Sequence, residues 1–157
     1  MPCYYDVVRE TTTNGSANTR SPHLLFLTGA NIRAKIVGLY GSCQSGTAGG
    51  ATLFGETAST AGSGGTTYTA GPRNALYPAA TTVVTTDATT ITTGTTLKSR
   101  CFAGLAQTGG MGGWVALEPD HAILLRPSGG ANGNFEVASK ANGTSITVRA
   151  QVEFSEE

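Results

Sequence analysis

The chain has 157 residues and a mass of 16.0 kDa, a size that favours one compact domain. Ten Lys and Arg balance ten Asp and Glu, and only 13% of the residues are charged. This excludes the basic field that drives nonspecific nucleic-acid binding, and it protects the protein only weakly against self-association. Threonine occurs 25 times and glycine 22 times, which favours strands and turns and excludes a helical bundle.

The chain has no pattern typical of secretion or membrane insertion. Residues 1–10 lack a basic start followed by an apolar core, so we expect no secretory signal. We expect the protein to be made in the cytoplasm. Gly, Ser and Thr interrupt each apolar run before the roughly 20 residues that a membrane helix needs. Cys3, Cys43 and Cys101 are odd in number and widely spaced, which predicts free thiols rather than one disulfide or a metal site.

The N-terminal 22 residues alternate little and end in a polar stretch. Tyr4, Tyr5, Val7 and Val8 form a short aromatic and apolar segment, and a polar stretch comes after it. We predict that residues 1–22 are an extended arm and polar tether that dock on another subunit, ahead of a sandwich domain at 23–157. The alternative is a first strand that packs on its own domain.

The middle of the chain contains short candidate strands separated by turn residues. These are 23–27, 32–40, 51–55 and 81–93. Residues 81–96 contain ten threonines, which favours an exposed or subunit-facing sheet, with disorder as the alternative.

The last third predicts its strands most clearly. Ile146, Val148, Ala150, Val152 and Phe154 alternate with polar residues, so one face of this strand enters a core and the other meets water or a neighbour. Asn142 and Gly143 predict a hairpin turn before it. The other expected elements are strands at 97–105, 114–117, 122–126 and 135–137 and a glycine-rich loop at 109–113. Some eight to ten short strands predict an all-β fold, an antiparallel β-sandwich of jelly-roll or related topology with an extended N-terminal arm.

Motifs that carry chemistry are absent from the sequence. It has neither a phosphate-binding Gly-x-x-x-x-Gly-Lys-Ser/Thr loop nor a Gly-x-Ser-x-Gly nucleophile elbow. His23 and His121 have no companion nucleophile motif, and Glu118-Pro119-Asp120 beside His121 is typical of a turn. We therefore expect no enzymatic activity, catalytic residue, metal or cofactor.

Trp114 is the only tryptophan and comes directly after Met111-Gly112-Gly113. A ring in this setting is typical of a sugar-stacking platform or a partner anchor. The strand-like run Val115-Ala116-Leu117 after it favours a ring that fills the end of the sandwich instead.

The C-terminal part resembles small structural proteins of tailed bacteriophages. The resemblance covers roughly residues 97–157, more faintly 32–43, and lies in the order of strands and turns. Its landmarks are Arg100-Cys101-Phe102-Ala103, Trp114 with Leu117-Glu118-Pro119, Ile123-Leu124-Leu125, Pro127-Ser128-Gly129-Gly130 and the ending Glu153-Phe154-Ser155-Glu156-Glu157. The family has the fuller Leu-Pro-Glu-Pro where this chain has Leu117-Glu118-Pro119-Asp120, and this chain also differs by its threonine-rich middle.

The resemblance implies a β-sandwich that assembles as a homotrimer and decorates a capsid or belongs to a tail or fibre. We expect a non-enzymatic virion protein on the outer capsid surface, with the major capsid protein and its own copies as partners and with neither nucleic acid nor membrane as a partner. One alternative is a receptor- or carbohydrate-binding module in which Trp114 and Tyr68 or Tyr77 stack on sugar rings. Another is a plain oligomeric tail component.

Overall fold

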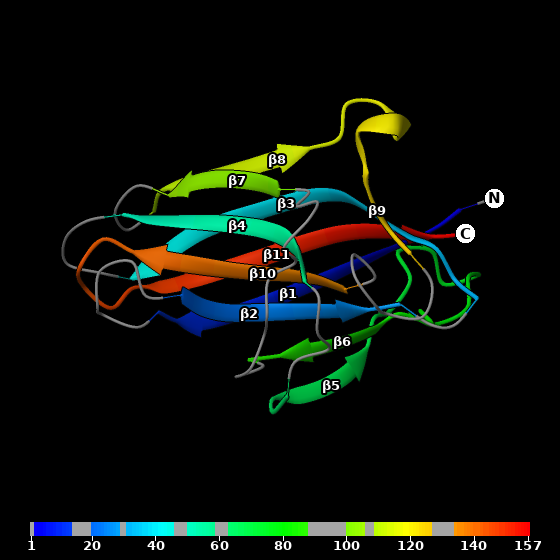
Figure 1. Cartoon of the computed structure of the whole chain (residues 1–157), viewed down its shortest axis with the longest axis horizontal. Coiled ribbons are helices and arrows are strands. Elements are labelled where there is room, and N and C mark those ends of the chain that lie inside the picture. The colour runs from blue at the N-terminus through cyan, green and yellow to red at the C-terminus, as the bar shows by residue number, and fades with distance from the viewer. Residues whose placement is uncertain are drawn as a thin grey trace.

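The protein is a sandwich of two antiparallel β-sheets (Figure 1). The computed structural model describes residues 2–13, 20–28, 31–45, 50–58, 63–87, 100–105, 109–126 and 134–157. In sheet A the strands run in the order β1 (Cys3–Thr12), β11 (Thr147–Glu156), β3 (Ala34–Ser45) and β8 (Met111–Val115), and β9 (Ile123–Leu125) also pairs with β3. In sheet B the order is β5 (Thr66–Thr69), β6 (Val83–Thr86), β2 (Arg20–Leu27), β10 (Asn134–Ala141), β4 (Ala51–Ala58) and β7 (Arg100–Leu105).

The strand order is that of a jelly roll. Without β5, β6 and β9, the strand order is β1-β11-β3-β8 in sheet A and β2-β10-β4-β7 in sheet B. This is the arrangement of eight strands in two Greek keys. The β5 and β6 strands extend sheet B beyond β2, and the 3-10 helix η1 (Pro119–His121) lies between β8 and β9. The predicted fold class is confirmed, and within the described residues no helix is long and apolar enough to cross a membrane.

The core lies between the sheets and contains a cluster of aromatic rings. The predicted alternation of β11 is confirmed, because Val148, Ala150, Val152 and Phe154 are fully buried. The Phe154 ring centroid is 5.1 Å from that of Tyr5 on β1 and 5.4 Å from that of Phe26 on β2. Burial of apolar surface between the two sheets is the main force that holds such a fold together.

The N-terminal segment is an intrinsic strand, so the expected docking arm is corrected. All ten residues of β1 pair with β11, from Cys3 opposite Glu156 to Thr12 opposite Thr147. Tyr5 and Val7 lie in the core, whereas Tyr4 and Val8 point outward. The two aromatic and two β-branched residues thus have the period of two of a half-buried strand. Residues 14–19 of the predicted tether lie outside the described part of the chain.

Two local predictions in the last third were also wrong. The glycine-rich stretch 109–113 was expected to be a loop, but β8 begins at Met111 and pairs with β3. The turn at Asn142 and Gly143 is present, with Gly143 at a φ of 101°, yet it joins β10 of sheet B to β11 of sheet A and forms no hairpin. Buried side chains of both strands belong to the core between the sheets, including Phe135 and Val137 of β10 and Val152 and Phe154 of β11.

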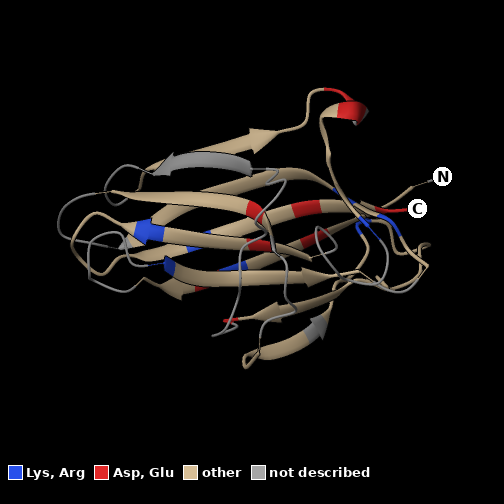
Figure 2. Ribbon diagram, viewed as in Figure 1, with Lys and Arg blue, Asp and Glu red and all other residues tan. Residues whose placement is uncertain are grey.

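The threonine-rich segment is described only in part. Residues 83–86 form β6, which pairs with β2 and β5, and Val84 belongs to the core. The remainder of the predicted strand, from residue 88 on, lies outside the described residues. Cys3 and Cys43 are free thiols, as predicted. Charged residues of both signs are thinly spread over the ribbon, and neither sheet carries a field of one sign (Figure 2).

Candidate functional site

The outward side of sheet A presents ordered rows of side chains from four strands. One row runs from Val8 on β1 through Gln151 on β11 and Tyr40 on β3 to Gly113 on β8. The next rows are Asp6, Glu153, Gly38 and Val115 on one side and Glu10, Arg149, Ser42 and Met111 on the other. We call this surface, together with Tyr4, Ser155, Lys35, Val37 and Leu124, the outer face of sheet A.

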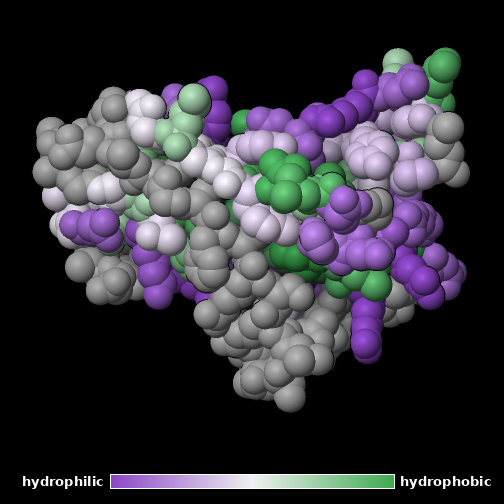
Figure 3. Space-filling view, turned by 90° about the horizontal axis from the view of Figure 1, so that it is seen from above, coloured by the Kyte–Doolittle hydropathy of each residue, from purple (hydrophilic) through white to green (hydrophobic). Residues whose placement is uncertain are grey.

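Exposed apolar side chains gather on this face. Among the described residues, eight large hydrophobic side chains are exposed: Tyr4, Val8, Leu76, Val83, Met111, Val115, Leu117 and Leu124. Five of them lie on the outer face of sheet A, and Leu117 lies beside it in the connection from β8 to β9. Seen from the β7 and β8 edge of the sandwich, apolar residues also reach the described surface, with hydrophilic residues beside them (Figure 3). Such gathering marks a surface that meets another molecule.

The Tyr40 side chain lies flat along the centre of the face. A Cβ added to Gly38 would be 2.9 Å from Tyr40 Cε2, and one added to Gly113 would be 3.0 Å from Tyr40 Cδ1. The two glycines therefore leave room for the ring against the backbone of the sheet. Burial of the ring, and next the carboxylate of Glu153, raise the pKa of Tyr40.

The charges on the face are paired within the chain. Arg73 Nε lies 2.5 Å from Asp6 Oδ2, and its guanidinium also contacts Glu153. Arg149 Nη2 is 3.2 Å from Glu10 Oε2. Lys35 Nζ is 2.7 Å from Glu157 Oε1. Exposed pairs of this kind add little stability, about 0 to 1 kcal/mol each, so their main effect is to leave the face without a field of one sign.

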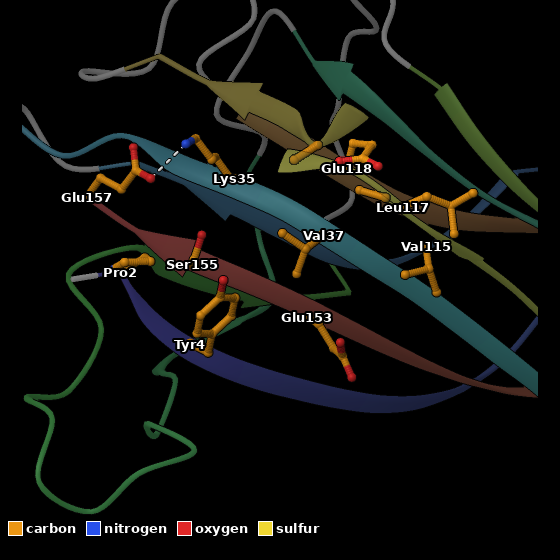
Figure 4. A pocket seen from close by; sticks show the side chains of 12 residues that line it. Pro2, Tyr4, Lys35, Val37, Val115, Leu117, Glu118, Glu153, Ser155 and Glu157 are labelled. Atoms are coloured by element: carbon orange, nitrogen blue, oxygen red, sulfur yellow. Dashed lines mark hydrogen bonds and ion pairs between the residues drawn. The ribbon is translucent and has the colours of Figure 1, made fainter. Parts of the chain in front are cut away.

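Two hollows lie on the face. The terminal hollow, of about 360 Å³, is lined by apolar side chains that include Tyr4, Val37, Val115 and Leu117 (Figure 4). The Lys35 and Glu157 pair lies at one end of it, and Glu153 belongs to its lining (Figure 4). The glycine hollow, of about 380 Å³, is lined by Tyr40, Gly41, Ser42, Met111, Gly112, Arg149 and Gln151.

The predicted partner-binding residues are divided between this face and the core. Tyr4 and Val8 lie on the outer face of sheet A, whereas Tyr5 and Val7 are buried beneath it. Trp114 pairs with Leu39, whose side chain is in the core, and packs partly buried against the core, so it lies off the outer face. Sequence reasoning missed Tyr40, Met111 and Val115, since their shared face depends on the pairing of β3 with β8.

The outward side of sheet B is different. Leu25, Glu136 and Glu56 form a row across β2, β10 and β4, and all three are buried. Arg20 Nε lies 2.8 Å from Glu136 Oε1, and Arg20 Nη2 lies 2.5 Å from Glu56 Oε1. Burial, opposed by the neighbouring Arg20, raises the pKa of Glu136. Because the chain itself buries these three side chains, this row offers no surface to a partner. The equivalent rows of sheet A include exposed side chains.

The histidines make no chemical site with their described neighbours. His23 Nε2 lies 2.7 Å from Ser139 Oγ, but both residues are fully buried, and Nδ1 has no hydrogen-bond partner among the described residues. Burial lowers the pKa of His23 to about 4. His121 lies exposed in η1. Within the described ranges, no three His, Cys, Asp or Glu side chains come together as a metal site.

Comparison with known proteins gives no indication of function, so the fold and the outer face of sheet A are the observations that remain. No family model, no curated protein and no solved structure matches the chain.

Proposed function

We propose that this protein is a non-enzymatic virion structural protein, a capsid decoration or cement protein that acts by binding protein subunits through the outer face of sheet A. The observation that carries the proposal is that six of the eight large hydrophobic side chains exposed within the described ranges lie on or beside this face. The charges on the face are paired, and the jelly roll is a fold that viral capsid proteins use. The phage resemblance of residues 97–157 supports the virion setting.

The mechanism is additive contact. A homotrimer bound at each junction of a capsid lattice would bury surface on neighbouring major capsid subunits. Binding to the assembled lattice but not to separated subunits stabilises the lattice by mass action. Because three chains act together, modest affinity per chain becomes strong binding to the particle through multivalency.

The experiment measures the copy number of the chain in purified particles of the phage that encodes it, by quantitative mass spectrometry against the major capsid protein. We expect a copy number comparable with that of the capsid protein, and loss of DNA at lower temperature from particles whose gene for the chain is deleted. A few copies per particle would indicate a tail component, and absence from particles would overturn the virion assignment.

Adding purified chain back to the deleted particles tests the face itself. Val8→Glu places a charge on the outer face of sheet A, and Val83→Glu places the same charge on β6 of sheet B. Their parent side chains are similarly exposed, 52% and 41%. We expect Val83→Glu to decorate particles as the natural chain does and Val8→Glu to fail. Specific binding of the natural chain to a glycan array would favour the carbohydrate-binding alternative.

A further inference from the structure

The outer face of sheet A has the layout of an interface between protein subunits. Its central row, Val8, Gln151, Tyr40 and Gly113, carries no charge. The rows on either side carry the ion pairs, Asp6 and Glu153 with Arg73 on one side and Glu10 with Arg149 on the other. The cores of specific interfaces are depleted of charge and enriched in aromatic residues, and the uncharged row that holds Tyr40 has this composition.

The face carries both the projecting side chains and the hollows that contact between two copies needs. It has projecting apolar side chains, with Met111 and Leu117 exposed by 82% and 86%, and it has the glycine hollow and the terminal hollow. Arg149 and Glu10 are about half exposed, so each also presents charge to a neighbour of the opposite sign. A symmetric assembly needs both members of each complementary pair on one chain. The zero net charge of the chain adds no repulsion between copies.

The size of the face suits such an assembly. Four strand positions lie about 4.8 Å apart, the fourth filled by β8 and β9 together, which pair with β3 one after the other. A length of about 27 Å for each, at about 3.4 Å per residue, gives a projected area of about 500 Å². The side chains that stand on this area, and the connection from β8 to β9, enlarge the accessible surface. Specific interfaces bury about 600 to 1,000 Å² on each partner, so one copy of this face against another reaches the lower part of that range.

We infer that the outer face of sheet A binds a second copy of this chain in a closed, symmetric homo-oligomer. The inference names the partner of the surface on which the proposed function rests. The contact to a capsid would then be made by the assembled oligomer.

The test is sedimentation velocity of the purified chain over a range of concentrations. We expect the natural chain to sediment as a discrete oligomer. Val115→Glu puts a carboxylate at the face, and Val83→Glu puts one on sheet B, where the parent valines are exposed to nearly equal extents, 46% and 41%. We expect Val115→Glu to sediment as a monomer with a β-rich circular dichroism spectrum, and Val83→Glu to match the natural chain. A monomeric natural chain, or a folded Val115→Glu that remains oligomeric, overturns the inference.

Hydrogen exchange of the unmodified chain gives a second measurement, which does not depend on a variant that folds. Amides of residues 111–117 should exchange more slowly in the concentrated oligomer than after dilution to monomer, while those of β6 should change little. Equal exchange at both concentrations would overturn the assignment of this face.

The two proposals fail separately. If the chain is an oligomer but is absent from virions, the inference stands and the virion assignment fails. If the chain is a monomer but is found in virions, the proposed function stands and the inference fails. A subunit of another virion protein, and not a second copy, then binds this face.

Discussion

The Tyr40 ring lies against Gly113, on the neighbouring strand of sheet A. A methyl group on Gly113 would be 3.0 Å from Tyr40 Cδ1 and 3.2 Å from the carbonyl oxygen of Leu39. One of these two atoms belongs to the backbone of a paired strand and cannot move away alone. The Tyr40 ring can therefore lie against β8 only because Gly113 has no side chain.

Gly113→Ala should destabilise the protein by about 1 to 3 kcal/mol, the usual cost of inserting a methyl group into a packed site. The matched control is Gly71→Ala, because a Cβ at Gly71 meets no atom within 4 Å. Urea unfolding measures both free energies. Equal stability of the two variants would show that Tyr40 moves away from Gly113 at no cost.

A comparison of the adjacent tyrosines of β1 tests whether this segment is an intrinsic strand. Tyr5 is 1% exposed, stacks on Phe154 and donates a hydrogen bond from its hydroxyl to the carbonyl oxygen of Pro78, whereas Tyr4 is 42% exposed. Tyr5→Ala should cost about 3 to 5 kcal/mol, as truncation of a buried aromatic ring does. Tyr4→Ala should cost much less. Thermal melts measure the difference, and deletion of residues 1–10 should abolish folding. If the chain without residues 1–10 keeps its melting point, these residues are a docking arm and not an intrinsic strand.

The fold could be predicted as far as its class because alternation is local. The period of two in β11 arises from residues that are adjacent in sequence, and it specifies which side chains enter the core. Residues 1–10 alternate little, because Tyr4 is adjacent to Tyr5 and Val7 to Val8, so the sequence there does not separate a strand from a docking arm. The turn at Asn142 and Gly143 has the same local chemistry in a hairpin and in a crossing between sheets, so the sequence around it leaves the connection open.

The candidate site could be predicted only in part because it is built across strands. Tyr40 and Gly113 are far apart in sequence, and their contact exists only when β3 pairs with β8. Glycines at 109–113 favour a loop when considered alone. Gly113 suits a strand because the Tyr40 ring lies against it, and this contact forms only in the folded chain. Tyr4 and Val8 were chosen from the sequence as partner-binding residues, and they do lie on the outer face.

His23 should make the stability of the protein depend on pH. Burial lowers its pKa from 6.5 to about 4, and of the nearby charges Asp87 opposes this shift and Arg9 adds to it. Between these two values the unfolded chain binds a proton that the folded chain does not. The free energy of unfolding should therefore fall as pH is lowered from about 6.5 to about 4, by about 3 kcal/mol in all.

Urea unfolding at pH 7 and pH 4.5 measures this effect. Burial raises the pKa of Glu136, which acts in the opposite direction, so the contribution of His23 is the difference between the natural chain and His23→Gln. The control is His121→Gln, at an exposed position in η1, which should keep the pH dependence of the natural chain. The same pH dependence in His23→Gln and the natural chain would contradict the prediction.

Arg20 should stabilise the protein far more than Arg149, although both form ion pairs. Arg20 contacts Glu136 and Glu56, which are 0% and 4% exposed, and its guanidinium lies 5.3 Å from the centre of the Phe54 ring. Arg20→Met retains the apolar stem but leaves Glu136 buried without this cation, which should cost about 3 kcal/mol at pH 7. Arg149→Met removes an exposed pair with Glu10 and should cost less than about 1 kcal/mol.

The pH dependence distinguishes loss of charge from loss of packing in Arg20→Met. Without Arg20, the pKa of Glu136 should rise further, because the cation that opposes the effect of burial is gone. Protonation of Glu136 then relieves the unpaired charge, so the stability difference between Arg20→Met and the natural chain should shrink as pH is lowered from 7 to 5. Urea unfolding of both proteins at the two pH values measures it. A difference that stays constant with pH would show that Arg20 stabilises the fold by packing over Phe54 and not by its charge.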